Sequence, residues 1–157
     1  MPVLEPQEHW DLVRECALFQ EFGDSELSRI LPIARERHFA SGSAIADSGE
    51  HAEALYVIAD GLVRVPSLMG TPSSLMMSSP EVFGISGLVP PHRYLKSAIA
   101  STDCRVLEIP IPALRAMVER DHSLSRRLMA RTAAYLHQRL VEAISDAHGH
   151  PIGNYLR

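Results

Sequence analysis

The spacing of apolar residues along the chain changes from helical to strand-like and back to helical. The first helical stretch covers residues 7–20, where Trp10 and Val13 fall on one face. A second short helix follows, with Asp24 or Ser25 as its capping residue. The chain is therefore expected to begin with a pair of helices.

Between residues 37 and 110, short apolar runs alternate with glycine, serine, aspartate and proline. The run ALYVIADGLVRV predicts two strands joined by a turn at Asp60 and Gly61, and LMGTPSSLMM predicts a hairpin around Gly70. Two later runs, YLKSAIAS and CRVLEIP, predict further strands. Strands this short, with turns this frequent, indicate an antiparallel sandwich or barrel.

The last third of the chain returns to helical spacing. Residues 112–120 predict a short helix, and a long helix capped by Asp121 or Ser123 is expected to extend to about Ala147. The arginines of this long helix are expected to form a solvated face rather than a nucleic-acid-binding patch: Arg126, Arg127, Arg131 and Arg139.

The long helix carries two apolar stripes. One stripe, with Leu124, Leu128 and Tyr135, is expected to pack on the strands. The other has the spacings of four and three that are typical of a coiled-coil seam, and it consists of Met129, Ala133, Leu136, Leu140, Ala143 and Ala147. Because one chain buries only one such face, the second stripe predicts a homodimer. The alternative is that the N-terminal helix of the same chain covers it.

Composition narrows the classes of function. Hydrophobic residues make up 46% and charged residues 22%, an ordinary globular balance, and the net charge of -4 argues against a broad nucleic-acid-binding face. Cys16 and Cys104 match no metal-ligand spacing. The sequence shows no signal peptide and no membrane-spanning run, so a cytoplasmic protein without membrane contact is expected. No nucleophile, phosphate-loop or zinc-protease motif is found, and an enzyme is not expected.

Four motifs in a fixed order resemble the cyclic-nucleotide-binding fold: GSAI at 42–45, GE at 49–50, LYVI at 55–58 and GLV at 61–63. Together with the long helix that follows them, they resemble the sensor domain of the Crp/Fnr family of transcription regulators. The segment LHQRL at 136–140 resembles the dimerisation helix in the nitric-oxide-responsive branch. The resemblance implies a mainly β protein with flanking helices, in which an antiparallel jelly-roll barrel precedes a long dimerisation helix.

The resemblance also implies how the chain is divided. Residues 1–110 would form the N-terminal helices and the β-barrel sensor, and residues 111–147 the short helix and the dimerisation helix. Residues 148–157 would be a hinge or the truncated start of a DNA-binding domain. The implied function is effector sensing and dimerisation, with DNA bound only through a domain absent from this chain.

The residues that would bind a cyclic nucleotide depart from the family's pattern. This degenerate phosphate cassette comprises Phe83, Gly84, Ile85, Ser86, Gly87, Leu88, Tyr94, Lys96 and Ser97. Ile85 stands where the family has a ribose-binding Glu. The family's phosphate-binding Arg falls on Tyr94 in an ungapped alignment and on Lys96 in a shifted one. Losing a hydrogen bond to a charged group costs about 1.5–3 kcal/mol, so binding of cyclic AMP through the family's usual contacts is not expected.

The sequence does not identify the effector, and two alternatives stay open beside an unknown small molecule. Some relatives bind haem, whose iron takes an axial ligand such as His. This resemblance makes His92 in the cassette and His137 on the long helix the haem candidates, for a sensor of nitric oxide or carbon monoxide. Alternatively, the domain has lost its ligand and acts as a dimerisation scaffold.

Overall fold

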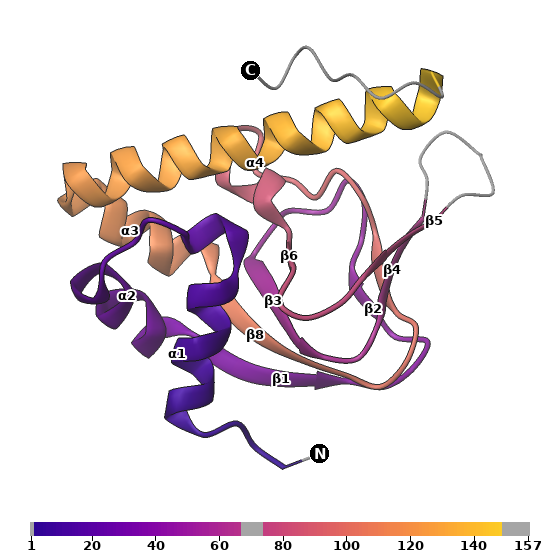
Figure 1. Cartoon of the computed structure of the whole chain (residues 1–157), viewed down its shortest axis with the longest axis horizontal. Helices are drawn as coiled ribbons and strands as arrows, with labels where there is room; N and C mark the ends of the chain where they lie inside the picture. Colours follow the sequence, from indigo (N-terminus) through magenta and orange to yellow (C-terminus); the bar gives the residue numbers. More distant parts are fainter. Residues whose placement is uncertain (1, 67–73, 149–157) are drawn as a thin grey trace.

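The structure is a computed structural model that describes residues 2–66 and 74–148, the last three of these as helix backbone only. Figure 1 shows strands curved into a barrel, with the N-terminal helices at one side and the long helix α4 (His122–His148) lying across it. The turn expected at Gly70 and residues 149–157 lie outside the described residues. Within the part that is described, no helix has the length and apolar character needed to cross a bilayer.

The described strands form two four-stranded antiparallel sheets. The first has the order β1 (Arg35–Phe39), β8 (Cys104–Pro110), β3 (Ala54–Asp60) and β6 (Val82–Phe83). The second has the order β2 (Ala44–Ala46), β7 (Ala98–Ala100), β4 (Val63–Pro66) and β5 (Ser74–Met77). Buried apolar side chains from both sheets and from the flanking helices form one continuous core. The predicted antiparallel jelly-roll-like barrel is confirmed.

The turn at Gly61 links the two sheets, because β3 pairs with β8 and β6 while β4 pairs with β5 and β7. Gly61 has a φ of 91°, and a Cβ at this position would lie 2.4 Å from the Asp103 carbonyl oxygen. Only glycine fits such a position. The two predicted strands and their turn are confirmed, although they do not pair as a hairpin. The run YLKSAIAS is extended as a strand only from Ala98.

The helices begin and end at identifiable caps. They are α1 (Pro6–Glu15), η1 (Ala17–Phe19), α2 (Asp24–Ile30), η2 (Leu31–Ile33), η3 (Ile85–Leu88), α3 (Ile111–Arg120) and α4. The cap of α2 is Gly23, whose N–H donates to Glu26 Oε1 at 3.0 Å, so the expectation of Asp24 or Ser25 was wrong by one or two positions. Asp121 accepts a hydrogen bond from the Leu124 N–H at 3.0 Å and caps α4 as predicted.

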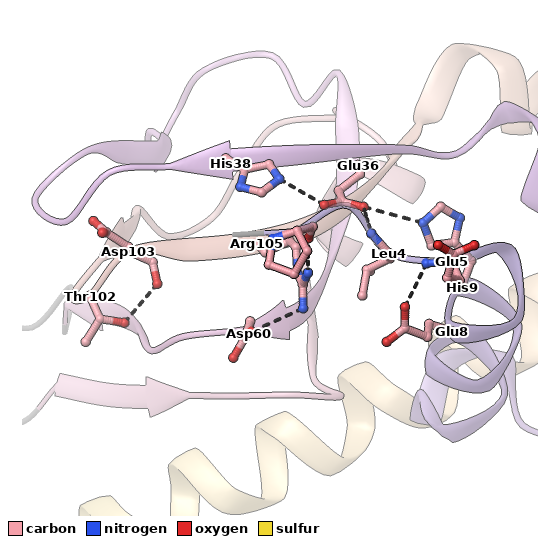
Figure 2. A network of polar contacts seen from close by, with 11 residues as sticks. Leu4, Glu5, Glu8, His9, Glu36, His38, Asp60, Thr102, Asp103 and Arg105 are labelled. Carbon is pink, nitrogen blue, oxygen red and sulfur yellow. Dashed lines mark hydrogen bonds and ion pairs between the residues drawn. The ribbon is translucent and has the colours of Figure 1, made fainter.

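Glu36 and Arg105 hold the N-terminal segment against the first sheet. Figure 2 shows Glu36 on β1, which accepts a hydrogen bond from the Leu4 N–H at 2.8 Å and contacts His38 Nε2 at 2.8 Å. Arg105 on β8 donates to the Pro2 carbonyl oxygen and pairs with Asp60 at 3.2 Å. These contacts fix the start of α1, which lies against β3.

Helix α4 packs on the rest of the chain along the first of its predicted stripes. Leu124 and Leu128 are fully buried, and the Tyr135 hydroxyl donates to the Val82 carbonyl oxygen at 3.0 Å. Two of its arginines contact the N-terminal region: Arg127 donates to Glu26 at 2.6 Å and Arg131 to the Ala17 carbonyl oxygen at 2.7 Å. Arg127 and Arg131, two of the four arginines expected on a solvated face, therefore contact the rest of the chain, while Arg126 is exposed.

Candidate functional site

A cavity of about 260 Å³ lies between the barrel and α4. The barrel contributes most of the predicted cassette to its lining: Phe83, Gly84, Ile85, Ser86, Tyr94, Lys96 and Ser97. Gly87 and Leu88 do not line the cavity but are buried beside it. The helix contributes Tyr135, Leu136, Arg139, Glu142 and Ala143. The cassette and the long helix thus form the two sides of one site.

The cassette begins at a sharp bend that needs glycine. Gly84 has a φ of 90°, and a Cβ there would lie 2.9 Å from the Ala54 carbonyl oxygen. The bend ends β6 and leads the chain into η3, which places the Ile85 side chain in the wall of the cavity. Ser86 then closes the cassette, because its hydroxyl donates to the Arg93 carbonyl oxygen at 3.0 Å and accepts from the Leu95 N–H at 3.2 Å.

The Tyr94 side chain stabilises the barrel through hydrogen bonds to the backbone of β3. Its hydroxyl donates to the Ala54 carbonyl oxygen at 2.8 Å and accepts from the Ala54 N–H at 3.3 Å. Burial raises the pKa of Tyr94, so the phenol stays neutral. The ungapped alignment therefore puts the family's phosphate-binding Arg on a side chain that already completes the hydrogen bonds of β3.

Lys96 and Ser97 differ in how they are held. The Lys96 side chain is exposed at the edge of the cavity, just before β7 begins. The Ser97 hydroxyl accepts a hydrogen bond from the Ser48 N–H at 3.0 Å, which ties the segment to the opposite loop. Among the described residues of the barrel, Lys96 is the cation that lines the cavity.

Arg139 on α4 is the residue of the site that the sequence interpretation missed. Its Nη2 and Nε donate to the Tyr135 hydroxyl at 2.8 and 3.1 Å, and its Nη1 donates to Glu142 at 3.2 Å. Its Nη2 also lies 3.5 Å from Glu81, in the loop before β6. The signal was present in the sequence, because the stripe that contains Leu128 and Tyr135 continues at helical spacing to position 139.

The two histidines proposed for haem lie away from this cavity. The Nδ1 atom of His92 is 2.8 Å from the Gly87 carbonyl oxygen, and His137 is exposed on α4. Neither of them lines the cavity. The residues present therefore do not fit a haem held in this cavity by His92 or His137. Among the described residues, no group of three or more His, Cys, Asp or Glu side chains is placed to hold a metal ion.

The second stripe of α4 is accessible along much of its length. Met129 and Leu140 are 37% and 57% exposed, and Ala133 and Ala143 are also exposed. Leu136 is partly buried and lines the cavity. The side chain of Ala147 lies outside the described residues. The alternative in which the N-terminal helix covers this stripe is wrong, since that region contacts α4 on the side of Arg127 and Arg131.

Comparisons with solved structures agree with this architecture. The chain is similar to a putative cyclic nucleotide-binding protein from Geobacter metallireducens GS-15, with 29% identity, a TM-score of 0.73 and coverage of 87% of this chain and 99% of that one. It is also similar to the catabolite activator protein of Thermus thermophilus, with 27% identity and a TM-score of 0.67, over 84% of this chain and 62% of that one. The chain thus spans less than two thirds of the Thermus protein.

A third likeness concerns the fold alone. The sensor domain of the transcriptional regulator DNR from Pseudomonas aeruginosa is 20% identical, with a TM-score of 0.66 and coverage of 85% of this chain and 92% of that one. No curated protein matches the chain. A family model described as the cyclic nucleotide-binding domain matches residues 36–121, which is more than half of the chain. This protein therefore belongs to the cyclic nucleotide-binding domain family, and its structural neighbours include Crp/Fnr-type transcriptional regulators.

Proposed function

We propose that this chain is the effector-sensing and dimerisation part of a Crp/Fnr-type transcription regulator. The observation that carries the proposal is the position of α4, which forms one side of the cavity and also exposes an apolar stripe. A molecule bound in the cavity would therefore contact the same helix that would pair with a second chain.

The side chains of the cavity favour an effector other than cyclic AMP bound through the family's usual contacts. Ile85 has no acceptor for a ribose hydroxyl, and burying that hydroxyl without a partner is costly. The Tyr94 hydroxyl is already hydrogen-bonded to Ala54 and carries no positive charge. Lys96 is a point charge and does not reproduce the paired donors of an arginine.

Signal transfer would depend on α4. Leu136 lines the cavity and belongs to the predicted seam, so a ligand that moves it would change the surface offered to the partner helix. A ligand shifts such an equilibrium only by its different affinity for the two states. DNA would be read by a domain that follows α4 in the whole regulator, because the net charge of -4 makes these residues poor phosphate binders.

The experiment is a thermal-shift screen of the chain with cyclic nucleotides, haem and small metabolites. A ligand of the folded state raises the unfolding midpoint. A variant with Ala143→Trp, at the rim of the cavity, should lose that increase. Ala130→Trp is the matched control, since Ala130 is exposed on the same helix and does not line the cavity. A screen without any stabilising compound would favour the ligand-free scaffold. A compound that stabilises Ala143→Trp as much as the unchanged chain binds outside this cavity and would contradict the proposed site.

A further inference from the structure

The cavity is apolar on most of its surface but is not neutral at its edges. Its apolar lining includes Val65, Leu75, Met77, Ile85, Leu95 and Leu136. Among the described residues, its charged lining consists of two cations, Lys96 and Arg139, and one anion, Glu142. At about 260 Å³ it is small, because ligand pockets commonly measure about 300–1,000 Å³. Size and lining together suit a compact ligand with an apolar body and one acidic group.

Arg139 is the cation that the fold holds in place. Its guanidinium lies over the Tyr135 ring, 5.1 Å from the ring centroid, and the Tyr135 hydroxyl is fixed in turn by the Val82 carbonyl oxygen. Three of its N–H groups donate to Tyr135 and Glu142. A guanidinium has about five N–H donors, so donors remain for a ligand.

The acidic neighbours of Arg139 do not fill its capacity. The Glu142 and Glu81 side chains are 47% and 38% exposed, and the closest approach of Arg139 to Glu81 is 3.5 Å. Exposed pairs of this kind contribute about 0–1 kcal/mol. A ligand anion can therefore displace them at small cost and form paired hydrogen bonds with the guanidinium.

We propose that Arg139 recognises the acidic group of the effector, which is a small, mostly apolar monoanion such as an aromatic carboxylate. This inference rests on the proposed function of the cavity as an effector site. Because Arg139 lies on α4, the ligand's charge is bound by the dimerisation helix itself and not by a barrel strand. Binding also competes with the contact from Arg139 to Glu81, which joins α4 to the loop before β6.

Two fluorescent probes that differ only in one sulfonate group test this assignment. The anion 8-anilinonaphthalene-1-sulfonate has an apolar ring system with a sulfonate, and N-phenyl-1-naphthylamine has the same rings without it. Arg139→Gln should weaken binding of the sulfonate by about ten- to a hundredfold, the usual effect of losing a charged hydrogen bond. Binding of the neutral probe should change by less than about twofold. Arg139→Lys should fall between Arg139→Gln and the unchanged chain, because it keeps the charge but loses the paired donors.

Arg126→Gln is the matched control, since Arg126 is exposed on the same helix and does not line the cavity. It should leave binding of both probes unaffected, and circular dichroism checks that each variant is folded. If Arg139→Gln weakens both probes equally, or neither, the assignment of Arg139 is overturned while the cavity remains a ligand site. If neither probe binds the unchanged chain, or if Ala143→Trp leaves the affinity for both probes unchanged, the proposed function fails as well.

Discussion

Replacing Tyr94 with phenylalanine is expected to destabilise the fold, although the change removes a single oxygen atom. Strand β6 ends at Phe83, and the chain turns away at Gly84 with a φ of 90°. Ala54 on β3 therefore has no described strand residue beside it on this side, and the Tyr94 hydroxyl supplies the missing hydrogen bonds. It donates to the Ala54 carbonyl oxygen at 2.8 Å and accepts from the Ala54 N–H at 3.3 Å. Phenylalanine fills the same space but leaves both backbone groups without a partner.

The magnitude follows from those two buried groups. An unsatisfied buried donor or acceptor costs about 1–3 kcal/mol, and part of this is regained because the phenol no longer has to be desolvated. We expect Tyr94→Phe to lower the free energy of unfolding by about 1–3 kcal/mol. For a chain of this size, that corresponds to a fall of about 2–12 °C in the unfolding midpoint.

Urea unfolding followed by circular dichroism measures this change. Leu95→Ala is the control, because Leu95 is the adjacent residue and is 63% exposed, so its loss should change the free energy by less than about 0.5 kcal/mol. If Tyr94→Phe is as stable as the unchanged chain, Tyr94 is not the structural partner of Ala54. That result would instead favour the ungapped alignment, in which Tyr94 occupies the ligand-binding position of the family's Arg.

Three further predictions follow from the site and its surroundings. Calorimetric titration should show no micromolar binding of cyclic AMP, and the double change Ile85→Glu with Lys96→Arg should gain affinity; tight binding by the unchanged chain contradicts the interpretation of the cassette. Burial acts to raise the pKa of Glu108, but hydrogen bonds and charges from Arg37 and Arg35 outweigh it and hold that pKa below its ordinary value. The resulting stability is present above the ordinary carboxyl pKa and is lost as the pH falls through the folded pKa. Below about pH 5, the free energy of unfolding of Glu108→Gln should therefore fall less with decreasing pH than that of the unchanged chain. The same pH dependence in both proteins would contradict this role of Glu108. Gel-shift assays with these residues alone should show no sequence-specific complex, and a nanomolar one would contradict this.

Turns and helix ends could be predicted from short local sequence patterns. Gly61 and the alternating residues before it indicate a turn between strands, and Asp121 precedes a long helical run and caps it. β3 and β4 pair with different strands, and these pairings depend on contacts between residues far apart in the chain. The local spacing of apolar residues carries no information about such contacts. β6 is only two residues long, too short to leave a periodic signal.

The candidate site was predictable where the family pattern marks it and was missed where the fold creates it. The resemblance located the cassette from Phe83 to Ser97, and most of these residues line the cavity. Arg139 looked like one of several surface arginines, although its spacing from Tyr135 places it on the packed stripe of α4, and the packing of α4 on the barrel then brings it into the cavity lining, unlike Arg126. For His92 the family resemblance and its place in the cassette suggested a haem ligand, whereas its ring nitrogen lies at hydrogen-bonding distance from the Gly87 carbonyl oxygen.

The mass of the chain in solution tests the central claim, that α4 joins two sensor domains through its exposed stripe. Light scattering coupled to gel filtration should give the mass of two 17.4 kDa chains, and of one chain for the double variant Met129→Glu with Leu140→Glu. Both side chains are exposed in one protomer, so the variant should stay folded, while its carboxylates would be buried at a paired seam. Ala130→Glu, exposed and off the stripe, should leave the dimer intact. A mass of one chain for the unchanged protein, or a dimer that survives both glutamates, would contradict the account.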